Sequence, residues 1–284
     1  MLAITCGFSA CKASASKAQA ENDSIQTEKS TLFVTDSVMY HQGNDSTLTC
    51  AITVDYPTES DSFSLAVRHY LNQELGNLFL PVVNEEPDPA KKQRYKGDLA
   101  NGQTVVDFYG KGNMKYLREQ QQEIGTYDDG NTPAMSYEAG IRKTAETDSY
   151  VTYRSTSYVF LGGAHGSASD YSVNICKDSK KVLKESVDTT KVKALQPLLK
   201  KGVLSYLKQA GEEEVNEQNL GDYLFIDKGI IPMPAHTPAL TDKGVHFIYQ
   251  QYEIGPYAMG MVEFTIPYQD IKPYLTAEAA KLLK

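Results

Sequence analysis

The chain has 284 residues, with 36 acidic and 28 basic side chains and a formal net charge of −8. Nucleic acids require a basic surface that meets their phosphates, so this charge argues against DNA or RNA as a partner. An acidic surface favours a cationic partner, although a mildly acidic balance is common in proteins. The 19 tyrosines suit half-buried strand faces and also the recognition of carbohydrate or protein.

Residues 1–11 pass from apolar side chains to small ones and a cysteine, which is typical of a bacterial lipoprotein signal remnant. On this interpretation Cys11 is lipidated after cleavage behind Ala10. No basic residue precedes Lys12, however, and the apolar run is short. The alternative is a cytosolic N-terminus with two incidental cysteines. The signal interpretation predicts a protein held in the cell envelope by its lipid, on the periplasmic or outer-surface side.

Residues 12–30 contain almost no bulky apolar side chain and cannot offset the entropy lost on ordering, so they are predicted to form a disordered tether. No later run of about 20 apolar residues follows, and we therefore expect a lipid anchor rather than a spanning helix. The rest of the chain is long enough for one large domain or two small ones.

Strand and helix patterns are interleaved without the regular alternation of a parallel α/β protein, which predicts an α+β fold with antiparallel sheets and packed helices. Two subdomains of similar size are expected, residues 31–176 and 177–284. In the first half of the chain the expected elements are strands at 31–39 and 46–55 around a turn at 41–45, a helix capped by Ser60 or Asp61, a surface loop or short helical excursion over 83–102, a helix over 113–124, and a hairpin over 135–160. Further on, the expected elements are a strand at 169–176, a helix over 191–209, strands at 245–251 and 261–267, and a final helix over 268–283.

Cys50 and Cys176 both lie in strand-like segments. In an oxidising compartment they could form a disulfide. The alternative is that both are small buried hydrophobic residues in neighbouring strands. Their spacing fits neither a zinc site nor a redox pair, so no metal site is predicted.

Two turns rich in glycine and aromatic residues, 161–166 and 250–260, form the main candidate site. His165 is the only histidine in a glycine-rich turn and could act there as base, ligand or hydrogen-bond donor. Alternatively, His165 caps the turn while its glycines supply special backbone angles. The candidate binding residues are Gly162, Gly163, His165, Tyr252, Glu253 and Tyr257.

Other side chains near these turns have two interpretations each. Tyr252 and Tyr257 either stack on a ligand or pack their loop onto the core. If the two loops meet, the carboxylates of Asp170, Glu253 and Glu263 could approach His165 and form an acid–base or metal site. His236, in a proline-rich loop, is either a binding lip or part of a connector.

The Gly-Gly-Ala-His-Gly turn, the leucine-rich helix and the segment Tyr-Glu-Ile-Gly-Pro-Tyr-Ala-Met-Gly resemble the extracytoplasmic domain pair of PdaC-like and RsiV-like bacterial proteins, here in a Bacteroidetes-type lipoprotein. The matching segments are 158–171, 192–207 and 246–274. Such domains occur beside peptidoglycan deacetylases, in anti-sigma factors that sense lysozyme, and in stand-alone lipoproteins. The resemblance therefore implies recognition in the envelope.

No reaction is indicated by the motifs. The aspartate and paired histidines of the deacetylases have no counterpart, and the sequence lacks Gly-x-Ser-x-Gly, His-Glu-x-x-His and phosphate-loop motifs. The favoured hypothesis is a non-catalytic lipoprotein, without cofactor, that binds a peptidoglycan fragment or a basic protein such as lysozyme. The alternative is a hydrolase or metal-dependent enzyme centred on His165.

Overall fold

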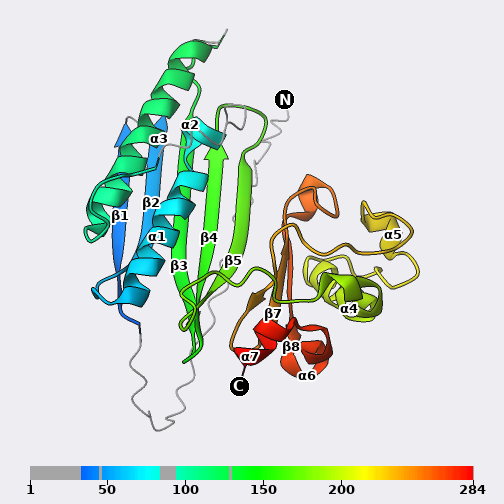
Figure 1. The fold of residues 1–284 in the computed structure, drawn as a ribbon. Coiled ribbons are helices and arrows are strands. Elements are labelled where there is room, and N and C mark those ends of the chain that lie inside the picture. The colour runs from blue at the N-terminus through cyan, green and yellow to red at the C-terminus, as the bar shows by residue number, and fades with distance from the viewer. Residues whose placement is uncertain (1–32, 45–46, 84–93, 128–129, 284) are drawn as a thin grey trace, which may run out of the picture. The chain divides into compact units, whose positions relative to one another are not determined.

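The computed structural model describes residues 33–283 apart from 45–46, 84–93 and 128–129. The predicted signal remnant with Cys11 and the tether over 12–30 lie outside this part. Within it, no helix is both long and apolar enough to cross a membrane. The fold is α+β, as predicted, with a five-stranded and a three-stranded sheet (Figure 1).

The larger sheet follows the order of the chain. Its strands are β1 (Thr35–Asn44), β2 (Leu48–Pro57), β3 (Met135–Glu146), β4 (Tyr150–Phe160) and β5 (Ser167–Cys176). Neighbouring strands are antiparallel, as predicted, except β2 and β3, which are parallel. A parallel pair needs a long crossover. The crossover contains α1 (Ser62–Asn77), α2 (Leu80–Val83) and α3 (Gly102–Ile124), which lie on one face of the sheet (Figure 1).

Capping residues set where the two long helices begin. The Asp61 carboxylate accepts hydrogen bonds from the backbone N–H groups of Phe63 at 2.7 Å and Ser64 at 3.1 Å, as predicted for this helix. Asn101 caps α3 in the same way. The helix predicted over 113–124 therefore begins eleven residues earlier, at Gly102, which is the last residue of the segment expected to be a loop or a short helical excursion.

The smaller sheet has the order β6 (Ala239–Leu240), β7 (Gly244–Tyr249), β8 (Val262–Pro267) and is antiparallel. Helix α4 (Val192–Gln209) packs on β8. The single helix predicted over 268–283 is instead α6 (Tyr268–Ile271), a 3₁₀ turn (Lys272–Tyr274) and α7 (Ala277–Lys281). Pro273 disfavours a continuous helix, and Thr276 caps a new one by accepting from the Ala279 N–H at 3.2 Å.

Two hydrophobic clusters stabilise these layers. One lies between α1, α3 and the larger sheet, and the other surrounds α4 and the smaller sheet. Tyr150 and Cys176, on β4 and β5, belong to the second cluster, so the larger sheet contributes to both. The described residues form one compact unit. The division into 31–176 and 177–284 stays a prediction, and the core changes close to that boundary.

Both cysteines in the described part of the chain are free and buried. Cys50 lies on β2 and Cys176 on β5, with β3 and β4 between them. Three strand spacings amount to about 14 Å, whereas a disulfide requires Cα atoms within about 7 Å. The possible disulfide is therefore not formed. The alternative, two buried apolar cysteines, fits the structure, although their strands are not neighbours.

Candidate functional site

The turn after β4 and the loop after β7 meet on the surface. The ring of His165 stacks on that of Tyr257, with centroids 4.2 Å apart and planes at 29°. The Tyr257 hydroxyl donates to the carbonyl of Gly166 at 3.1 Å, across 91 residues of sequence. The two turns singled out in the sequence thus form one structure.

Four aromatic side chains gather at this junction, and we call them the aromatic platform: Tyr158, His165, Tyr252 and Tyr257. The rings of Tyr252 and Tyr257 lie 5.7 Å apart at 41°. His165, Tyr158 and Tyr252 are exposed, the last with 57% of its surface accessible. The platform therefore presents several rings to solvent at the ends of rigid strands.

The glycines of the turn have different roles. Gly162 has a φ of +80°, which a side chain rarely adopts, and its carbonyl accepts from the Tyr127 hydroxyl at 2.8 Å. At Gly166 a Cβ would overlap the ring of Tyr158, so that ring would have to move. Gly163 has no positive φ, and a Cβ there would have no neighbour within 4 Å. The expectation that all the glycines supply special angles is correct for Gly162 alone.

Tyr252 also has a positive φ, +66°. A bulky residue in this region costs roughly 1–2 kcal/mol. The adjacent Glu253 holds the loop, because its carboxylate accepts from the backbone N–H groups of Gln250 and Ala235, both at 2.6 Å. Glu253 thus binds the protein's own backbone, whereas the sequence predicted a ligand contact. Tyr252 therefore combines a strained backbone conformation with a solvent-exposed ring.

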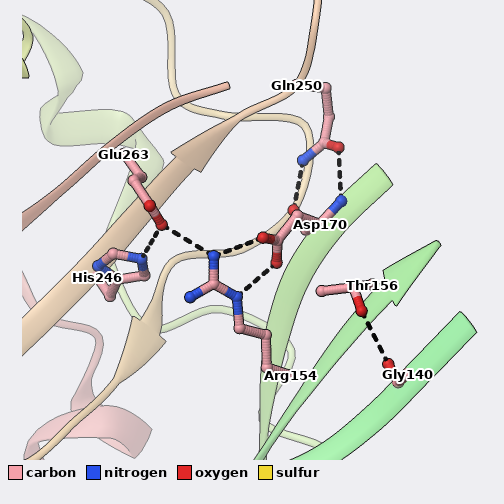
Figure 2. Close-up of polar contacts among 7 residues, drawn as sticks. All are labelled: Gly140, Arg154, Thr156, Asp170, His246, Gln250 and Glu263. Atoms are coloured by element: carbon pink, nitrogen blue, oxygen red, sulfur yellow. Dashed lines mark hydrogen bonds and ion pairs between the residues drawn. The ribbon is translucent and has the colours of Figure 1, made fainter. Parts of the chain in front are cut away.

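The other two candidate carboxylates bind a cation rather than His165. Arg154 on β4 donates from Nε to Asp170 on β5 at 2.7 Å and from Nη2 to Glu263 on β8 at 2.9 Å (Figure 2). His246 on β7 lies 3.2 Å from the same Glu263 oxygen. The hydrogen bond from His246 and the charge of Arg154 hold the pKa of Glu263 below its usual value.

Within the described residues, no hydrogen bond joins His165 to a carboxylate; its Nδ1 lies 3.0 Å from the carbonyl of Gly166. Nor do any three His, Cys, Asp or Glu residues of this part form a group that could hold a metal. The carboxylates that could have formed an acid–base or metal site with His165 are therefore not bonded to it. The ring nitrogen caps the turn, as the alternative interpretation expected.

His236 packs against the larger sheet. Its ring stacks on Tyr171 of β5, with centroids 4.0 Å apart and planes at 6°. Burial lowers the pKa of His236. The Tyr171 hydroxyl in turn donates to the buried carboxylate of Glu74 on α1. The proline-rich loop around His236 is thus a connector fixed to the sheet.

The sequence did not indicate the Arg154 network. Arg154 lies in a strand of alternating residues, where a charged side chain normally faces solvent. The partners of Arg154 are 16 and 109 residues away. The backbone of Asp170 is also bound twice by the Gln250 side chain, at 3.1 and 2.7 Å (Figure 2). Arg154 and Glu263 meet only because the two sheets lie against each other.

Comparison with known proteins agrees with this architecture. Residues 180–269 match the family model described as "Protein of unknown function (DUF3298)". The sequence matches no curated protein. A DUF3298 family member from Bacteroides fragilis NCTC 9343 is 20% identical, with a TM-score of 0.53 over 85% of this chain and 93% of its own. A DUF3298 family protein from Pseudomonas aeruginosa PAO1 is 14% identical, with a TM-score of 0.52 over 86% and 96%. The chain thus contains a segment that matches DUF3298, and its fold is similar to that of DUF3298 proteins.

Proposed function

We propose that this protein is a non-catalytic binding protein of the cell envelope and that the aromatic platform binds a cell-wall glycan. The observation that supports this is the group of exposed rings held by two converging loops. Tyrosine offers a large apolar face for the C–H side of a sugar and a hydroxyl for its polar groups. The chemistry of the platform therefore suits a saccharide better than a charged small molecule.

The geometry supports binding rather than hydrolysis. A catalytic histidine needs a proton acceptor or donor oriented toward its second ring nitrogen. In the described part of the chain, the three carboxylates that could serve His165 are bound to Arg154 or to backbone N–H groups. His165 is thus placed to stack on a ligand together with Tyr257.

A basic protein such as lysozyme is the second candidate partner. The segment after α4 exposes a run of acidic side chains, and the chain has a net charge of −8. Such a surface accelerates association with a cationic protein and makes binding sensitive to salt. The acidic side chains of this run are Glu212, Glu213, Glu214 and Glu217.

The test is calorimetric titration of the protein with soluble peptidoglycan fragments and, separately, with lysozyme. Tyr252→Gly is the informative variant, because glycine relieves the positive φ while the exposed ring is lost. We expect its stability to stay within about 1 kcal/mol of the wild type and its glycan affinity to fall about tenfold, as for loss of one stacked ring. Met39→Ala removes an exposed apolar side chain from β1 and serves as the control.

The outcomes separate the candidates. Glycan binding that Tyr252→Gly weakens and Met39→Ala leaves unchanged supports the platform. Saturable, salt-sensitive binding of lysozyme without glycan binding favours the protein partner. Absence of both would overturn the proposed function.

A further inference from the structure

A groove adjoins the aromatic platform, between α4 and β8, with a volume of about 500 Å³. One wall is helical, and the other consists of the five consecutive residues 263–267. Successive side chains of a strand point to opposite faces. A cavity lined by five consecutive residues must therefore run along the edge of the strand rather than over one face.

That edge of β8 has no partner strand among the described residues, because β8 pairs only with β7. Backbone N–H and C=O groups at a sheet edge can bind an extended peptide as an additional strand. The base of the groove is apolar: the Phe264 ring lies against the Cα of Gly202 and stacks on Phe247 at 5.3 Å and 10°. The packing of Phe264 on Gly202 and Phe247 thus holds this edge of β8 in place.

Two charged side chains of the groove have no partner within the part of the chain that the structure describes. Lys201 on α4 and Asp270 on α6 line the groove, and neither makes a hydrogen bond or ion pair with the described residues. Glu263, by contrast, is held by Arg154 and His246. The groove therefore offers one ammonium group, one carboxylate and a backbone edge. This combination complements a short peptide that carries both a carboxylate and an amino group.

The groove and the platform share one turn of the chain. Tyr206 of α4 lines the groove, and its hydroxyl donates to the carbonyl of Met259 at 2.8 Å. Met259 ends the 3₁₀ turn Tyr257–Met259, which also carries the platform residue Tyr257. The Tyr206 hydroxyl therefore links one wall of the groove to the turn that carries Tyr257.

We propose that the groove binds, in extended conformation along β8, the short peptide attached to a cell-wall glycan whose sugar lies on the aromatic platform. This inference rests on the proposed function. Lys201 binds a carboxylate of the peptide and Asp270 binds its amino group. A second copy of the chain fits less well, because α4 flanks the same edge in each copy and pairing would bring two such helices together.

The experiment compares three probes by calorimetry on the full chain: the N-acetylglucosamine–N-acetylmuramic acid disaccharide, the free stem tetrapeptide, and the disaccharide carrying that tetrapeptide. We expect the combined ligand to bind at least about tenfold more tightly than the disaccharide, because the second contact is then intramolecular. Lys201→Glu should abolish this gain and leave disaccharide affinity within about twofold.

A matched control lies on the same helix. Lys193→Glu makes the same charge change at an exposed position that does not line the groove, and it should retain the gain. Ser205→Phe fills the groove without a change of charge and should reduce the gain as well. Amide hydrogen exchange within 263–266 should slow when the combined ligand is bound, since the N–H groups that face the free edge gain partners.

The two proposals fail differently. If the disaccharide binds and the attached peptide adds no affinity, the groove proposal is overturned and the platform proposal stands. If only the free peptide binds, and Lys201→Glu weakens it, the groove proposal survives in a narrower form while glycan binding fails. A gain that persists in both Lys201→Glu and Ser205→Phe, or a dimer formed through β8, would also overturn the groove proposal.

Discussion

Arg154 of β4 and Glu263 of β8 are hydrogen-bonded at 2.9 Å, although 109 residues separate them in sequence. The same guanidinium binds Asp170 on β5 (Figure 2). One cation therefore ties two strands of the larger sheet to the edge strand of the smaller one. Because β5 begins just after the His165 turn and β8 just after the Tyr257 loop, this tie also fixes the two halves of the aromatic platform.

Replacing Arg154 by Met should destabilise the protein by about 1–3 kcal/mol, because two partly buried carboxylates then lose their counter-charge. This cost is smaller than that of breaking a fully buried ion pair. The Arg154 side chain is 33% exposed, and water therefore screens part of its charge. Urea unfolding at neutral pH measures the change.

The control for this variant is Lys115→Met, which removes an exposed pair with Glu119 at 3.6 Å. Its effect should stay below about 0.5 kcal/mol. Equal effects of the two variants would show that the Arg154 network contributes no more than a surface pair.

His236 should make the stability depend on pH near neutrality. Burial lowers its pKa below the usual 6.5, so the unfolded state takes up the proton first as the pH falls. The stabilising contribution is complete above pH 6.5 and is lost as the pH falls through that value toward the folded-state pKa. His236→Phe keeps the stack on Tyr171 without a titrating group. We expect its stability to fall less than that of the wild type between about pH 7.5 and about pH 5.

Chemical denaturation at the two pH values tests this expectation, and His69→Gln, an exposed position on α1, is the control. The control should retain the wild-type loss of stability. If His236→Phe behaves in the same way as the control, His236 is not the residue responsible.

The two glycines at 163 and 166 should respond oppositely to alanine. Gly166→Ala places a Cβ against the Tyr158 ring and should cost about 1–3 kcal/mol. Gly163→Ala places its Cβ in open space and should change the stability by less than about 1 kcal/mol. A small increase in stability is expected, because alanine lowers the conformational entropy of the unfolded chain. Thermal unfolding of the pair measures the difference, and similar values would contradict the close approach of Tyr158 to the turn.

The two buried cysteines should be unreactive in the native protein. Burial raises the pKa of the Cys50 thiol to about 12 and also raises that of Cys176, so neither forms the reactive thiolate near neutral pH. In a variant with Cys6→Ser and Cys11→Ser, iodoacetamide should label both thiols only after unfolding in urea. The intact mass of this variant, measured without reductant, should correspond to a protein with two free thiols. A mass that matches a disulfide would refute the strand order.

The sequence by itself determined the elements whose signals are local. Asp61 capped the expected helix, and the alternating residues of 135–160 formed the expected hairpin. The α+β class followed from these elements. Where the deciding signal was one capping side chain or one proline, as at Asn101 or Pro273, the predicted boundaries were wrong.

The tertiary structure decided what depends on distant partners. The strand order placed β3 and β4 between Cys50 and Cys176, and this separation excluded their disulfide. The pairing of β4 and β5 placed Asp170 beside Arg154, and the contact between the two sheets placed Glu263 there. The carboxylate of Glu253 accepts hydrogen bonds from backbone N–H groups instead. The Asp61 cap and the alternating pattern of 135–160 act within a few residues, so the sequence reveals them directly. The Arg154–Glu263 ion pair and the His165–Tyr257 stack, by contrast, form only when folding brings residues about a hundred positions apart into contact.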